Sequence, residues 1–203
     1  MSGSFADRLA VALEKSGTPL CMGLDPHPAL LPAFLADHEP VEALRLFGQL
    51  AIEAAAEAGL PAVKPQVALF EQHGPAGMGV LAELGDQARQ AGLLVIMDAK
   101  RGDIGSTSAA YAAAWLGPDA PFVADALTVN PFMGMDTLIP FIEAAADNGR
   151  GLFVLVRTSN EGSGDLQDLE AGGKPVWQKL ADLLAQLDKG AAASLTGKSG
   201  WSG

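Results

Sequence analysis

Short apolar runs alternate along this chain with longer segments in which apolar residues recur at helical spacing. The runs predict strands at Pro19–Asp25, Pro61–Gln66, Leu93–Lys100, Ala124–Asn130 and Gly151–Ser159. The longer segments predict helices at about Val41–Ala58, Ala76–Ala91, Ser106–Trp115, Asp136–Asp147 and Val176–Lys189. Another short amphipathic helix is expected before the first strand. Such alternation is typical of βα units built around a parallel sheet.

Glycines mark the expected ends of several helices. Gly59, Gly92 and Gly149 each follow an apolar-periodic segment, where a left-handed residue commonly terminates a helix. A further segment, Asn160–Gly173, is rich in glycine and serine and is expected to be a mobile loop.

Polar side chains stand at the carboxyl ends of the predicted strands. They are Asp25, Lys64, Asp98, Lys100, Asn130 and Ser159. In a (β/α)8 barrel these strand ends meet at one mouth, where active sites are built. We therefore expect a single domain over residues 1–203, of the α/β class and the (β/α)8 TIM barrel family, with about the first five βα units present. An open doubly wound sheet remains possible, although no G-x-G-x-x-G follows the first strand.

The segment Leu93–Thr107, LLVIMDAKRGDIGST, carries the strongest chemical signal. An apolar run ends there in Asp98, Lys100 and Asp103, and Asp98 and Lys100 share one face if the strand continues. Burying an isolated ion costs several kcal/mol, so this concentration of charge indicates a site. The alternative is an internal salt bridge between the strand end and a loop, which would need only two charges.

Composition excludes several classes of protein. The chain is 49% hydrophobic and 18% charged, which is typical of a globular protein, and no apolar run approaches the roughly 18 residues of a membrane span. A net charge of −11 argues against nucleic acid as a partner and requires a local positive cluster for any anionic substrate. The single cysteine, Cys21, is expected to be a small buried hydrophobe, and its isolation favours the cytoplasm. The histidines show no metal-ligand spacing.

The motif Asp98-x-Lys100-x-x-Asp103-Ile104-x-x-Thr107 resembles the signature of the orotidine 5′-phosphate decarboxylase family, which makes UMP. Further blocks are similar to its longer, type 2 bacterial branch. They are Phe5–Leu9, Cys21–Pro28, Val63–Gln66, Phe70–Gly74 and Val129–Phe132. The resemblance implies a cytoplasmic (β/α)8 barrel homodimer that needs neither a metal nor an organic cofactor.

The resemblance also implies roles for the matched positions. Asp25 and Lys64 would bind ribose hydroxyls of orotidine 5′-phosphate, and Lys64 would also belong to the charged network. Asp98 would face the substrate carboxylate, while Lys100 would protonate C6 of the pyrimidine.

Other matched positions concern the dimer and the base. Asp103, Ile104 and Thr107 would reach the site of the partner subunit. Ser159 would hydrogen-bond the pyrimidine ring, and Asn130 would contact the substrate.

Local structure offers a simpler interpretation of several of these residues. Asp25 and Asn130 each precede a proline and could begin turns, and Ser159 could be a loop hydroxyl. Thr107, near the start of a predicted helix, could serve as its cap.

The family's phosphate-binding loop, arginine and glutamine have no counterpart in this sequence. We therefore expect a chain truncated at its C-terminus and nearly inactive by itself, because binding energy from a remote phosphate lowers the barrier at the reacting centre. Three alternatives remain: a Mg²⁺-dependent sugar-phosphate decarboxylase, a Schiff-base aldolase, and an inactive barrel that acts only as a dimerisation partner.

Overall fold

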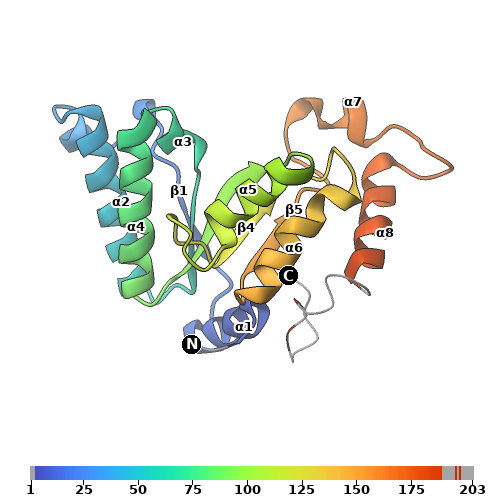
Figure 1. The fold of residues 1–203 in the computed structure, drawn as a ribbon. Helices are drawn as coiled ribbons and strands as arrows, with labels where there is room; N and C mark the ends of the chain where they lie inside the picture. The colour runs from blue at the N-terminus through green and yellow to red at the C-terminus, as the bar shows by residue number, and fades with distance from the viewer. Residues whose placement is uncertain (1–2, 189–194, 196, 198–203) are drawn as a thin grey trace.

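A five-stranded parallel sheet forms the centre of the computed structural model, which describes residues 3–188, 195 and 197 (Figure 1). The strands are β1 Cys21–Leu24, β2 Ala62–Pro65, β3 Leu94–Arg101, β4 Ala126–Val129 and β5 Gly151–Val154. Their order in the sheet is β1-β2-β3-β4-β5, the same as in the chain. A doubly wound sheet would reverse its order at a switch point, so this topology is that of a barrel.

Most helices follow a strand and cover one face of the sheet, whereas the helix that precedes the first strand packs against the other face. The longer ones are α1 Phe5–Ser16, α2 Pro40–Glu57, α4 Gly74–Gln90, α5 Gly105–Leu116, α6 Ile139–Asp147 and α8 Val176–Asp188. Neighbours along the chain pack side by side, α2 on α4 and α5 on α6 (Figure 1). Lys189, the expected end of the last helix, lies outside the described residues.

Short helical elements, none of them predicted, occupy the connections. They are η1 Pro28–Leu30, η2 Ala33–Leu35, α3 Ala68–Glu71, η3 Met135–Leu138, η4 Glu161–Ser163 and α7 Gly164–Gln167. The last two lie within the segment Asn160–Gly173, which therefore contains ordered turns. The predicted helix ends are confirmed, since Gly59, Gly92 and Gly149 have φ values of 66°, 82° and 61°.

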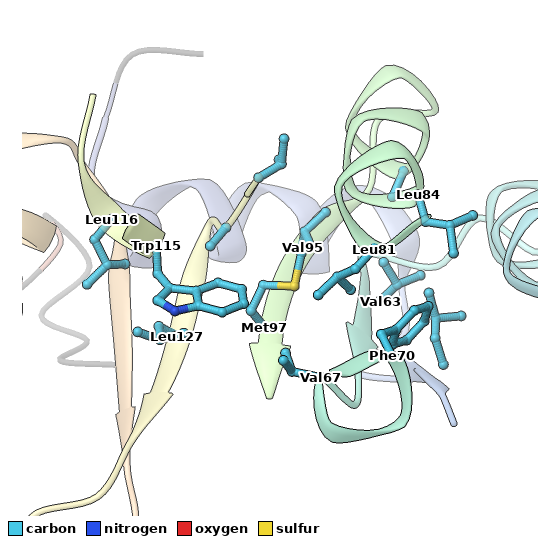
Figure 2. Packing of buried hydrophobic residues seen from close by; sticks show 14 of the residues in the cluster. Val63, Val67, Phe70, Leu81, Leu84, Val95, Met97, Trp115, Leu116 and Leu127 are labelled. Carbon is cyan, nitrogen blue, oxygen red and sulfur yellow. The ribbon is translucent and has the colours of Figure 1, made fainter. Parts of the chain in front are cut away.

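The main core lies between the sheet and its outer helices. Figure 2 shows Val95 and Met97 of β3 facing Leu81 of α4 and Trp115 of α5, with Phe70 of α3 close by. These side chains are buried. Their burial supplies most of the hydrophobic free energy that fixes β3 between its neighbours.

A second apolar cluster fills the other face of the sheet at the amino ends of the strands. Phe5 of α1 packs there against Ala62, Leu94, Ile96 and Ala126. The fit is close, because a Cβ on Gly151 would lie 2.2 Å from Phe5 Cδ1. Side chains alternate along a strand, so the face that carries Leu94 and Ile96 next carries Asp98. The polar site therefore lies toward the opposite, carboxyl end of this face.

Cys21 differs from its expected position. Its side chain is exposed rather than buried, because β1 is the first strand of the sheet order and pairs only with β2 in the described part of the chain. An apolar run predicts a buried strand, but it does not tell which strand stands at an edge.

Candidate active site

The carboxylate of Asp98 is the centre of a polar cluster at the carboxyl ends of β2, β3 and β4. One oxygen, Oδ2, accepts hydrogen bonds from Lys64 Nζ at 3.0 Å and from Gln66 Nε2 at 3.1 Å. The other, Oδ1, accepts from Lys100 Nζ at 2.6 Å and from Thr128 Oγ1 at 2.9 Å. Asp98 is only 7% exposed. These four hydrogen bonds offset the free-energy cost of burying the carboxylate.

The charge state of Asp98 follows from these contacts. Burial by itself raises the pKa of the carboxyl, but hydrogen bonds from Lys100, Lys64 and Thr128 and the charge of Lys64 outweigh it, so the pKa is lowered. Asp98 is therefore ionised at neutral pH and faces two ammonium groups. One of these groups belongs to Lys64, whose charged partner is thus Asp98.

The backbone of β3 is irregular where Lys100 stands. Met97 pairs with Leu127 and Arg101 pairs with Val129, so three residues of β3 bulge opposite the single residue Thr128 of β4. Lys100 has a φ of 49°, the one positive value for a non-glycine residue among those described. Such a conformation costs of order 1–2 kcal/mol, and strain of this kind is often found at functional sites.

Both lysines remain accessible from solvent, although their partner is buried. The side chain of Lys64 is 36% exposed and that of Lys100 is 45% exposed. Two ammonium groups contact the single carboxylate of Asp98 in a chain of net charge −11. Accessible ammonium groups are what an anionic substrate would need.

Asp25 lies beside this cluster, directly after the end of β1. Its Oδ2 would be 2.3 Å from a Cβ on Gly23, and Gly23 pairs with Lys64 in the sheet. Its carboxylate thus folds back over β1 next to the strand that carries Lys64. The backbone oxygen of Asp25 also accepts from the His27 amide at 2.7 Å, so a turn begins here as well.

Asp103, Ile104 and Thr107 follow the bulge, and the contacts that the structure gives for them are local. Asp103 accepts a hydrogen bond from the Ile104 amide at 2.8 Å, within its own loop. Ile104 is 61% exposed, and Thr107 is also exposed. The interpretation of Thr107 as a helix cap is wrong, because α5 begins at Gly105 and its N-cap residue is Ile104.

Asn130 and Ser159 are both exposed. The side-chain oxygen of Asn130 accepts from the Phe132 amide at 3.0 Å, so this residue does form the turn expected before Pro131. That bond leaves the Asn130 amide group as its donor for other contacts.

Two residues of the cluster, Gln66 and Thr128, were not among the predicted site residues. A signal for each exists in the sequence. Gln66 is two positions after Lys64 and so shares its face, and Thr128 is the one hydroxyl in the apolar strand Ala126–Val129. A polar residue inside a wholly buried strand needs a partner, which here is Asp98.

Metal-ligand clusters and membrane-spanning helices are both absent from the described part of the chain. No group of three or more His, Cys, Asp and Glu side chains there could hold a metal ion. None of the helices described has the length and apolar character needed to cross a membrane.

Comparison with known families identifies the chain. The model of the "Orotidine 5'-phosphate decarboxylase / HUMPS family" matches residues 18–198. The chain belongs to this family. Two curated relatives are named orotidine 5′-phosphate decarboxylase. The one from Rhodopirellula baltica is 47% identical over 196 residues, which is 92% of this chain and 65% of the relative. The one from Salinispora arenicola is 46% identical over 189 residues, 93% of this chain and 67% of the relative.

Solved structures of orotidine 5′-phosphate decarboxylases have the same fold. A Streptomyces avermitilis protein to which this enzyme name is assigned matches 93% of this chain and 66% of its own, with 43% identity and a TM-score of 0.83. Leishmania donovani OMP decarboxylase matches 93% of this chain and 66% of its own, with 34% identity and a TM-score of 0.72. The expected barrel family is thus confirmed, and the chain spans about two thirds of the length of these relatives.

Proposed function

We propose that the protein decarboxylates orotidine 5′-phosphate to UMP in pyrimidine biosynthesis. The observation that carries this proposal is the pair of ammonium groups, Lys64 and Lys100, held on the single buried carboxylate of Asp98. Relatives 46–47% identical to the chain that bear the name of this enzyme support it. The single cysteine in the sequence is consistent with a cytoplasmic location.

The chemistry needs a fixed positive charge at the reacting carbon. When the bond from C6 to the carboxylate breaks, CO₂ leaves and its electron pair stays on C6 in an orbital without a conjugated sink. The Lys100 ammonium would stabilise that charge most when it has concentrated on C6, which is differential binding of the transition state. A proton then passes from Lys100 Nζ to C6 and leaves a neutral amine.

Asp98 would keep this proton donor in place. Its carboxylate lies 2.6 Å from Lys100 Nζ, and this ion pair fixes the position of the ammonium group. An ammonium group held in an ion pair has no free electron pair for attack on a carbonyl, so the arrangement disfavours the Schiff-base aldolase. Asp98 would also face the substrate carboxylate, whose loss relieves the repulsion between them.

The remaining residues would bind the substrate. We assign the ribose hydroxyls to Asp25, which directly follows β1, and to Lys64 of the neighbouring strand β2. Asn130 and Ser159, both exposed, follow β4 and β5 and would contact the substrate and its pyrimidine ring. These placements agree with the convergence of strand ends in a barrel.

We further propose that the working enzyme is a homodimer. Asp103, Ile104 and Thr107 make local contacts, and Ile104 presents a large apolar side chain to solvent. A second subunit would cover Ile104 and bring Asp103 to the partner's Lys100. In that arrangement each lysine gains a second carboxylate. Replacing Ile104 by aspartate should shift the protein toward monomer in analytical ultracentrifugation.

The decisive experiment measures UMP formation in a chimera. Residues 18–198 of this chain replace the matching segment of the Rhodopirellula baltica relative, so the result does not depend on the length of the present chain. UMP should form, and Lys100→Ala should reduce kcat by about 10²–10⁴-fold or more, because it removes the acid and the charge. Lys174→Ala is the matched control, since Lys174 pairs with Asp182 on the surface.

A folded chimera that makes no UMP would refute the proposal, as would equal losses in Lys100→Ala and Lys174→Ala. Assays in excess EDTA separate this function from a Mg²⁺-dependent sugar-phosphate decarboxylase. We expect full activity in EDTA, because the proposed step uses only Lys100 and Asp98 as charged reactants.

A further inference from the structure

The hydroxyl of Thr128 joins two parts of Lys100 to one carboxylate oxygen. The Lys100 amide lies 2.8 Å from Thr128 Oγ1, and Thr128 Oγ1 lies 2.9 Å from Asp98 Oδ1. The Lys100 ammonium reaches the same oxygen at 2.6 Å. Main chain, hydroxyl, carboxylate and ammonium therefore form a closed ring that begins and ends on Lys100.

The direction of each hydrogen bond in this ring is determined by its donors. A backbone amide can only donate, so Thr128 Oγ1 accepts from Lys100. The single hydroxyl proton of Thr128 is then free to point at Asp98, whose ionised oxygens can only accept. While Asp98 is charged, the ring therefore has one arrangement of protons.

The ring also accounts for the unusual backbone of Lys100. In the bulge of β3 the Lys100 amide has lost its place in the ladder with β4, because the regular pairs are Met97 with Leu127 and Arg101 with Val129. The buried hydroxyl of Thr128 takes the place of the missing backbone acceptor. It thereby supports the backbone of Lys100 at a φ of 49°, a conformation that residues other than glycine rarely adopt.

We propose that Thr128 is a positioning residue, which sets the place of the Lys100 ammonium through its backbone and through Asp98. The catalytic part of this inference rests on the proposed function, in which Lys100 is the proton donor that Thr128 holds in place. Thr128 does not touch the substrate in this scheme. It acts through Lys100 and Asp98, and it does so from a neighbouring strand.

The test uses NMR on the 203-residue chain without ligand, so that it does not require turnover. Two quantities are followed: the titration of the Asp98 carboxyl carbon and the hydrogen exchange of the Lys100 amide. Lys64 and Lys100 are the charged groups that contact Asp98, and both are kept. Thr128→Val, which preserves shape but removes the hydroxyl, should raise the Asp98 pKa and speed exchange at Lys100 about tenfold or more.

Two further variants separate positioning from general loss of structure. Thr128→Ser retains the hydroxyl and should restore both readouts toward those of the wild type. Thr137→Val is the matched control, because Thr137 is another buried threonine with one bond, to the Gly134 carbonyl at 2.6 Å. It should leave Asp98 and Lys100 unchanged. Thr128→Val with both readouts unchanged would overturn the inference.

The wild type provides a measurement that needs no variant. If Thr128→Val does not fold, slow exchange of the Lys100 amide in the wild type still supports the ring. Exchange as fast as that of exposed loop amides would overturn it.

A kinetic measurement in the chimera connects the ring to the reaction. There Thr128→Val should lower kcat by about 10–100-fold while KM changes little, because a small misplacement of the proton donor affects the transition state more than binding. A change in KM alone would contradict the positioning role. A wild-type chimera without UMP formation would refute the decarboxylase function, and the NMR results would still decide whether the ring exists.

Discussion

The ammonium group of Lys100 lies 2.6 Å from the carboxylate of Asp98, two positions earlier on the same strand. Such a pair would satisfy both charges, yet Lys64 from β2 donates to the other oxygen of Asp98 at 3.0 Å. The carboxylate therefore serves two cations at once. That second cation, at a strand end open to solvent, distinguishes the cluster from an internal salt bridge.

The lowered pKa of Asp98 should make the free energy of unfolding fall at acid pH. Its pKa in the folded protein lies below the ordinary 3.8, so the unfolded chain binds more protons in the window between the two values. The stabilisation is present above about pH 4 and is lost as the pH falls through the lower, folded pKa. Urea unfolding at a series of pH values should show this loss in the wild type and a smaller one in Asp98→Asn.

Asp182→Asn is the control for this experiment, since it removes a carboxylate from an exposed surface pair. It should keep the acid slope of the wild type. Identical slopes in the wild type and Asp98→Asn would show that the carboxylate is not held as described.

The exposed thiol of Cys21 can report on the charge of Lys64. Burial of part of the group raises the pKa of this thiol above 9.0, and the Lys64 ammonium lowers it in part. The thiolate is the reactive form. Lys64→Met should therefore raise the pKa further and slow alkylation by iodoacetamide at a fixed pH near 8. Lys179→Met, which removes a lysine of α8 instead, is the control and should react at the wild-type rate. Equal alkylation rates in the wild type, Lys64→Met and Lys179→Met would contradict the proximity of Lys64 to Cys21.

Phe5 should contribute strongly to stability, although it belongs to α1 and precedes every strand of the sheet in the sequence. It is buried among the residues that fill the amino end of the sheet, so Phe5→Ala should lower the free energy of unfolding by about 3–5 kcal/mol. Val11, on the same helix, is 57% exposed, and Val11→Ala should change it by about 0.5 kcal/mol or less. Urea unfolding of both variants tests the difference, which would vanish if α1 did not cover the sheet.

Two glycines of α4 should respond in opposite directions to replacement by alanine. A Cβ on Gly77 would lie 2.1 Å from the Phe70 carbonyl oxygen, whereas a Cβ on Gly79 would meet nothing within 4 Å. Gly77→Ala should destabilise the protein by about 1–3 kcal/mol or more. Gly79→Ala should stabilise it by about 0.5–1 kcal/mol, because alanine loses less backbone entropy in a helix. Thermal unfolding measures both, and shifts of the same sign would refute the close approach of α3 to α4.

Much of the fold could be predicted from the pattern of the chain. Short apolar runs located all five strands of the described sheet, and glycines located helix ends, because both features depend on local geometry. The motif around Asp98 and Lys100 could be predicted for the same reason, since residues two apart on a strand share a face. The short helices α3 and α7 could not be predicted, because four residues are too few to show a helical period.

The sequence by itself thus indicated the family, the positions of the strands along the chain and the identity of the charged residues. Only the tertiary structure decided which of them meet. Lys64 lies 34 positions from Asp98, and Thr128 lies 30 positions from it. Their meeting depends on strand register and on a bulge in β3, and both result from packing across the sheet. Asp103, by contrast, accepts a hydrogen bond from the amide of the next residue, Ile104, which is a local contact.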